Sequence, residues 1–179
     1  MFYVSEIQRT APASFRTPLQ KAVYQALDQL HIPFERVDTD EAITMEDCIQ
    51  IDERLDMKMV KTLFLTNRQQ TNFYLFITCG NKSFRAKEFS AALDIARVSF
   101  APAEKMETML ATKVGAATVF SALLDTAKDV QIVFDRDVLS EEWYGCSDGT
   151  TTGYMKVPTA QITGDFLTYA KHTPTIIEI

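Results

Sequence analysis

Apolar residues recur three or four positions apart between Leu19 and Leu30, which is the spacing of an amphipathic helix. The residues just before them favour a helix start. Thr17 suits the N-cap, Pro18 suits the first helical position, and Gln20 follows the cap by three residues. The pattern therefore predicts a helix that begins at Pro18.

Short continuous apolar runs further along the chain predict buried strands. The runs at 60–65 and 73–78 are separated by the polar stretch 67–72, which is typical of an antiparallel pair in the middle of a sheet. Single strands are expected at 34–37, 130–134 and 175–179.

Helix signals fall between and after these strands. Thr44 opens one helix, a second lies around 87–93, a third begins near Pro102, and Thr163 caps a last one. The elements do not follow a strict strand–helix–strand alternation. We therefore expect an α/β (α+β) fold in which helices pack around a mixed β-sheet.

The length of 179 residues fits one domain with a core of its own. Residues 1–16 read as an extension that is packed on the domain or partly loose, and no linker or repeat divides residues 17–179. No apolar run approaches the length of a membrane span, and the first residues lack the basic region of a signal peptide. We expect no membrane partner.

Charge and cysteine usage narrow the class of protein. The formal net charge of −6 argues against a general DNA-binding protein and restricts any contact with nucleic acid to one end or one loop. Cys48, Cys79 and Cys146 are widely separated, which predicts free thiols in a reducing compartment. A cytoplasmic location is therefore expected.

The common catalytic and nucleotide-binding motifs are missing. Neither of the two histidines stands in a GxSxG, Cys–His or HExxH arrangement, and the chain has no GxxxxGK[ST] or GxGxxG segment. The cysteines form no CxxC pair. The sequence accordingly predicts neither a bound metal nor a cofactor.

Lys61 is unusual because it stands inside an apolar strand, where lysine is depleted. Its side chain could lie on an exposed face or reach the rim of the sheet with its stem buried. It could also aim a cation into a pocket, to hold a phosphate or polarise an oxygen. The strand pattern alone leaves both interpretations open.

The stretch 144–154 contains three glycines and three consecutive threonines between two tyrosines. Its many hydroxyl and backbone N–H groups suit a loop that binds a ligand, but a plain surface hairpin has the same composition. Both interpretations are again open.

Six segments stand in a specific order along the chain: Lys61-Thr62-Leu63-Phe64-Leu65, Lys82 to Phe89, Val98 to Ala101, Val114 to Leu123, Val130 to Asp135, and His172 to Ile179. This ordered set resembles the YbaK/ProX family of aminoacyl-tRNA deacylases. It is most similar to the branch of free-standing prolyl-tRNA synthetase-associated domains. The resemblance covers the stretch 17–179, and it implies a mixed, partly closed sheet wrapped by helices.

The resemblance also implies an activity and a set of site residues. Members of the family hydrolyse the ester that joins a wrong amino acid to tRNA, often alanine on tRNA for proline. By this likeness Lys61 and Gly115 are the catalytic positions, and the backbone amides around Gly115 line the pocket. The substrate-binding positions would be Thr62, Ala116, Ala117, Thr118, Phe120, Thr152, Gly153, Tyr154 and Met155. We then expect the segment 150–154 to be a mobile lid, because glycine allows large backbone changes.

Two departures from the family pattern keep other functions open. Thr62 stands where the family usually has asparagine, and a Gly-His-Pro-like segment falls on Gly153-Tyr154-Met155. The first hypothesis is a trans-editing deacylase acting on aminoacyl-tRNA, with tRNA for proline as its partner. The second is a non-catalytic module of the same fold that binds an aminoacyl-tRNA end or a free amino acid. The third is a regulatory partner that associates with a synthetase.

Overall fold

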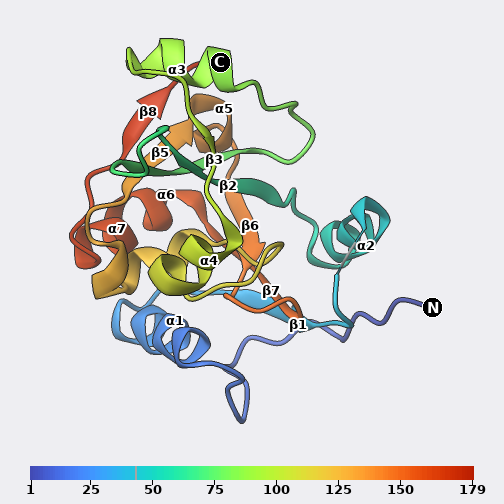
Figure 1. The fold of residues 1–179 in the computed structure, drawn as a ribbon. Helices are drawn as coiled ribbons and strands as arrows, with labels where there is room; N and C mark the ends of the chain where they lie inside the picture. The colour runs from blue at the N-terminus through green and yellow to red at the C-terminus, as the bar shows by residue number, and fades with distance from the viewer. Residues whose placement is uncertain (43) are drawn as a thin grey trace.

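Two β-sheets form the framework of the protein, for which a computed structural model describes residues 1–42 and 44–179 (Figure 1). Within these residues the larger sheet has the strand order β4-β2-β3-β5-β8, and the smaller sheet has the order β1-β7-β6. The strands are β1 (Glu35–Asp38), β2 (Val60–Thr66), β3 (Phe73–Cys79), β4 (Ser99–Phe100), β5 (Gln131–Asp135), β6 (Trp143–Ser147), β7 (Gly153–Pro158) and β8 (Thr175–Ile177).

The larger sheet contains both strand directions. β2 and β3 form an antiparallel pair in which Lys61 lies opposite Thr78, and β4 adds to the other edge of β2. β5 runs parallel to β3, and β8 runs parallel to β5. The predicted antiparallel pair and the mixed α/β architecture are confirmed. A single sheet was expected, however, and the structure divides its strands between two.

Helices pack around the two sheets, and α2 (Met45–Leu55) lies against β1 and β7 of the smaller one (Figure 1). Among the described residues, none of them is both long and apolar enough to cross a membrane. The helices are α1 (Pro18–Gln29), α2 (Met45–Leu55), α3 (Ala86–Leu93), α4 (Ala103–Lys105), α5 (Arg136–Leu139), α6 (Thr159–Gln161) and α7 (Leu167–Tyr169), with π-helical turns at Met106–Leu110 and Ile162–Phe166 and 3₁₀ turns at Val119–Leu123 and Asp125–Ala127.

Side-chain alternation along β2 divides the apolar core. Phe64 belongs to the main cluster, which also contains the buried face of α1. Leu63 and Leu65 pack on the opposite side, in a second cluster with Phe89 of α3. Successive side chains of a strand point to opposite faces of the sheet, so β2 presents its residues alternately to these two clusters.

The starts of the first two helices agree with the sequence signals. The Thr17 hydroxyl accepts the backbone N–H of Gln20 at 3.0 Å, as an N-cap should. Thr44 and Asp47 form the reciprocal hydrogen bonds of a capping box at the start of α2. Both predicted helix starts are therefore confirmed.

The last helical segment begins five residues earlier than expected, because a cap at Thr163 would place the first helical residue at 164. It starts at Thr159, directly after Pro158 ends β7, whereas Thr163 was predicted to be its cap. Thr163 lies one turn inside, with its hydroxyl 3.4 Å from the Thr159 carbonyl oxygen. A threonine hydroxyl can bond the preceding turn of a helix as well as cap its start, and this ambiguity caused the error.

The N-terminal extension lies along the edge of the smaller sheet. Gln8 and Arg36 exchange backbone hydrogen bonds of 2.9 and 2.8 Å. The Arg36 side chain, only 3% of whose surface is exposed, donates to the carbonyl oxygen of Thr10 at 2.6 Å. These contacts hold part of the segment 1–16 against β1.

Asp52 in α2 gives the protein a measurable pH dependence. Burial raises its pKa from 3.8 to about 6, although its carboxylate accepts the Met59 backbone N–H at 3.1 Å. Because the folded state holds this proton more tightly than the unfolded state, stability rises as the pH falls from above 6 toward 4.

We expect Asp52→Asn to raise the free energy of unfolding by about 1 kcal/mol at pH 7.5, a value reduced for the partial exposure of the side chain. The difference between the two proteins should nearly vanish at pH 4. Urea unfolding of both proteins at the two pH values measures it. An equal difference at both would contradict the assigned pKa.

Candidate functional site

Lys61 is half-buried near the start of β2. Its Nζ donates to the backbone carbonyl oxygen of Lys82 at 2.6 Å. Strand alternation places Lys61 on the same face as Leu63, toward the cluster beneath α3. The side chain thus reaches the turn that follows β3, where its ammonium meets a neutral oxygen.

Thr62 points to the other face of β2, where the two sheets meet. The buried hydroxyl of Tyr144 has Thr62 as its polar neighbour, but the two do not reach hydrogen-bond geometry. Burial raises the pKa of Tyr144, so the phenol stays neutral. A bridge between Met59 and Gly145 joins the start of the β2 strand to β6 at this point.

Gly115 occupies a turn that requires glycine. The Ala116 N–H donates to the Lys113 carbonyl oxygen at 3.0 Å, and Gly115 has a φ of +92°. A Cβ at this position would meet no atom within 4 Å. The constraint is therefore the left-handed backbone conformation, which turns of type II require of their third residue, and the glycine itself is exposed.

The residues after this turn enter the core. Ala116 is buried, Ala117 packs against the main cluster, and Phe120 meets Phe166 edge-to-face at 5.1 Å between ring centroids. The fully buried Thr118 hydroxyl donates to the Ser147 carbonyl oxygen at 2.8 Å. This bond joins the Gly115 segment to the end of β6.

The connection between β6 and β7 is organised around Asp148, whose surface is 1% exposed. One carboxylate oxygen accepts from Gln20 Nε2 and from the Tyr24 hydroxyl, both at 2.9 Å. The other accepts from the backbone N–H of Thr150 at 3.1 Å and from its hydroxyl at 2.7 Å. Four donors therefore compensate a buried carboxylate that forms no ion pair with any residue described.

The expected lid residues belong to this fixed connection. Thr152 receives the Thr39 N–H on its carbonyl oxygen at 2.9 Å, and Gly153 starts β7. Tyr154 packs under α2, whereas Met155 is fully buried in the main cluster. The stretch 144–154 is thus a hairpin, but a buried and hydrogen-bonded one, and neither a surface loop nor a free lid.

The structure brings the candidate residues together in two groups. In the first group, Thr118 joins the Gly115 segment to the end of β6, and Thr62 is a neighbour of Tyr144, which also belongs to β6. Lys61 stands apart from them. Within the residues described, no hydrogen bond or ion pair joins Lys61 to either segment. Sequence reasoning missed Asp148, because an aspartate between serine and glycine reads as an ordinary turn residue.

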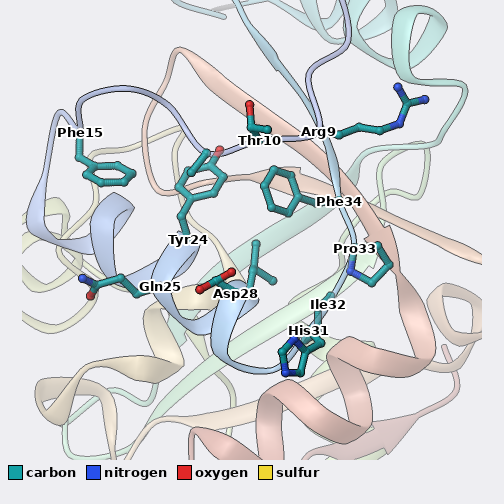
Figure 2. Close-up of a pocket in the computed structure, with 12 residues that line it drawn as sticks. Arg9, Thr10, Phe15, Tyr24, Gln25, Asp28, His31, Ile32, Pro33 and Phe34 are labelled. Atoms are coloured by element: carbon teal, nitrogen blue, oxygen red, sulfur yellow. The ribbon is translucent and has the colours of Figure 1, made fainter.

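An open pocket of about 630 Å³ lies between the N-terminal segment, α1 and the start of β1 (Figure 2). Figure 2 shows the rings of Phe15, Tyr24 and Phe34 along its wall. It contains none of the candidate residues named from the sequence. Tyr24 nevertheless links it to the β6–β7 connection, because its hydroxyl donates to Asp148.

The part of the chain that the structure describes contains no evident set of metal ligands. No group of three or more histidine, cysteine, aspartate or glutamate side chains lies close enough there to hold an ion. The candidate positions themselves carry an ammonium, backbone amides and hydroxyls.

Comparison of the sequence with known proteins assigns the chain to a family. A model of the aminoacyl-tRNA editing domain matches residues 39–163. The prolyl-tRNA editing protein ProX of Acetoanaerobium sticklandii is 28% identical over 121 residues, which are 67% of this chain and 73% of that protein.

Solved structures agree in fold. One that is provisionally assigned as a trans-editing enzyme for prolyl tRNA synthetase superposes with a TM-score of 0.64 at 14% identity, covering 92% of this chain and 99% of its own. A structure from work on grafting epitopes onto scaffold proteins has a TM-score of 0.65 at 14% identity, covering 91% and 98%.

Proposed function

Because the chain belongs to the family of aminoacyl-tRNA editing domains, we propose that it hydrolyses in trans the ester of a small amino acid, such as alanine, wrongly attached to tRNA for proline. The resemblance to YbaK/ProX deacylases is borne out by the family match. The choice of tRNA is supported by the similarity to a prolyl-tRNA editing protein.

The extent of the family match carries the proposal. The matched residues 39–163 include every candidate position from Lys61 to Met155. They also include the whole of β2, the Gly115 turn and the β6–β7 hairpin. All of the candidate positions therefore lie within the matched residues, whereas residues 1–38 and 164–179 lie outside them.

Few catalytic groups are needed for this reaction, because an aminoacyl ester is already activated. Positioning a water and donating hydrogen bonds to the developing oxyanion can suffice, at about 3–4 kcal/mol for each preorganised donor. The exposed turn at Gly115 would present backbone amides to the aminoacyl group. Lys61 would hold the terminal phosphate and ribose with its ammonium, which has N–H groups left after its bond to Lys82.

A deacylation assay separates this proposal from the hypothesis of a binding module. Alanyl-tRNA for proline is incubated with the protein, and released alanine is measured beside the affinity for the charged tRNA. Binding without release would identify a non-catalytic module.

Association with a synthetase remains a prediction, which co-purification from the cytoplasm would test.

We expect the protein to prefer small amino acids. Gly115 is exposed and has no side chain, and the buried Ala116 and half-buried Ala117 behind it are small. An apolar pocket discriminates one methylene by only about 1–3 kcal/mol. Rejection of the cognate prolyl ester should then depend on shape. Single-turnover rates on tRNA charged with alanine, serine and larger amino acids measure the preference, and faster cleavage of the large ones would refute this pocket.

A further inference from the structure

Among the described residues, a single backbone oxygen orients the ammonium of Lys61. Its single hydrogen bond runs to the Lys82 carbonyl oxygen at 2.6 Å, and it makes no ion pair there. An ammonium has three N–H donors. Two of them remain for a substrate, and no carboxylate among the described residues forms an ion pair with Lys61.

The carbonyl that holds Lys61 belongs to a tight turn that lies directly against the entry to β2. The Lys82 N–H donates to the Cys79 carbonyl oxygen at 3.0 Å, which closes the turn. A Cβ on Gly80 would come within 2.5 Å of the Met59 backbone oxygen. Only glycine therefore allows the turn this close to the strand that carries Lys61.

The Lys82 side chain ties the turn down from its other side. Its Nζ lies 2.7 Å from Asp135 Oδ2, 2.8 Å from Asp137 Oδ2 and 2.6 Å from the Ile179 backbone oxygen. Three acceptors use all three N–H donors. Lys82 thus has none left for a substrate, in contrast to Lys61.

We call these interactions of the Lys82 ammonium the clamp, and Asp135 is its buried carboxylate. It is 1% exposed, and besides Lys82 it accepts the Thr78 hydroxyl at 2.7 Å and the Asp137 N–H at 3.1 Å. Burial alone would raise its pKa, but the bonds from Lys82 and Thr78 outweigh burial and hold the pKa below its usual value. Asp137, in contrast, is an exposed partner whose side chain is 62% exposed.

We propose that Asp135 and Lys82 are positioning residues for the editing reaction. The buried carboxylate holds the Lys82 ammonium, this clamp fixes the turn from Cys79 to Lys82, and the Lys82 carbonyl oxygen directs the Lys61 ammonium toward the tRNA end. The inference rests on the proposed function of Lys61 in deacylation.

A double-mutant cycle tests whether Lys82 acts through Lys61. We expect Lys82→Met to lower kcat/KM for alanyl-tRNA by about 10- to 100-fold in the wild-type background, and by less than about threefold when Lys61 is already alanine. Asp135→Asn should follow the same pattern. Equal losses in the two backgrounds would overturn the proposal, because a residue that supports only the fold lowers activity whether or not Lys61 is present.

Control variants separate the clamp from charge and stability. Lys58→Met removes another lysine in an ion pair, the exposed one with Glu141, and should leave kcat/KM within about twofold of wild type. Lys82→Arg keeps the charge and should retain more activity than Lys82→Met. Thermal melts accompany each variant. If Lys82→Met does not fold, Lys82→Gln, whose amide can still donate to Asp135, replaces it in the cycle.

A second measurement does not depend on editing activity. The rate at which a small acylating reagent modifies Lys61, followed by mass spectrometry across pH, reports the environment of its amine directly. We expect Lys82→Met to change that rate at least threefold, and Lys58→Met to leave it unchanged. An unchanged rate in Lys82→Met overturns the positioning role. A wild-type protein that hydrolyses no aminoacyl-tRNA refutes the proposed function and leaves this measurement valid.

Discussion

Replacing Lys61 with alanine is expected to lower the single-turnover rate of deacylation by roughly 30- to 1000-fold, which corresponds to about 2–4 kcal/mol of transition-state stabilisation. The physical reason is its placement. The ammonium is fixed on a rigid strand by one bond to the Lys82 carbonyl oxygen and keeps two donors for the substrate. A preorganised charge of this kind needs no reorganisation when the tRNA end arrives.

The fold should survive this substitution. Lys61 is only half-buried, and the bond that it makes to Lys82 is a single one. We expect the free energy of unfolding to change by about 1 kcal/mol or less. Thermal melts beside the rate measurements separate the two effects. An unfolded Lys61→Ala protein would make the residue structural, and a fully active one would remove it from the site.

Lys61→Arg is the matched comparison for charge. Arginine keeps the positive charge, but its planar guanidinium is larger and cannot occupy the same position against the Lys82 carbonyl oxygen. We expect it to restore the rate only in part. Full recovery would mean that any cation near the tRNA end suffices and that the geometry around Lys61 is unimportant.

Local patterns were enough to predict most of the elements. The pair β2 and β3 follows from two apolar runs, and the starts of α1 and α2 follow from Thr17 and Thr44, because a helix cap is a local interaction. The position of Lys61 inside a strand could likewise be read directly. These features depend on neighbours within a few residues.

Two strands of the smaller sheet, β6 and β7, could not be predicted in this way, whereas its third strand, β1, was expected at 34–37. β6 and β7 read as a glycine- and threonine-rich loop because what makes them strands lies far away in the sequence. Gln20 reaches Asp148 across 128 positions, and Tyr24 reaches it across 124. The hydrophobic periodicity of a short segment carries no information about such distant contacts. A buried polar centre was therefore mistaken for a flexible lid. The separation of Lys61 from Thr62 was unpredictable for the same reason. It depends on which distant segments pack on each face of β2.

Gly153 shows what this difference means for a mutation. A mobile lid would tolerate a larger residue there with some loss of turnover and little loss of stability. In the structure Gly153 has no positive φ, so its conformation suits any residue. A Cβ would, however, overlap the Asp148 carboxylate, lying 2.7 Å from its Cγ and 2.8 Å from Oδ1. The constraint is space beside a buried group.

We therefore expect Gly153→Ala to destabilise the protein by about 3–5 kcal/mol, because the Asp148 carboxylate must shift away from donors on Gln20, Tyr24 and Thr150 and then stays buried without them. Gly164→Ala is the control, since a Cβ there meets nothing within 4 Å, and it should be neutral or stabilising by up to about 1 kcal/mol. Thermal and urea unfolding of both variants measure the difference. If Gly153→Ala instead melts like the wild type and only slows deacylation, the connection between β6 and β7 moves during turnover, and Asp148 does not fix it as its four hydrogen bonds indicate.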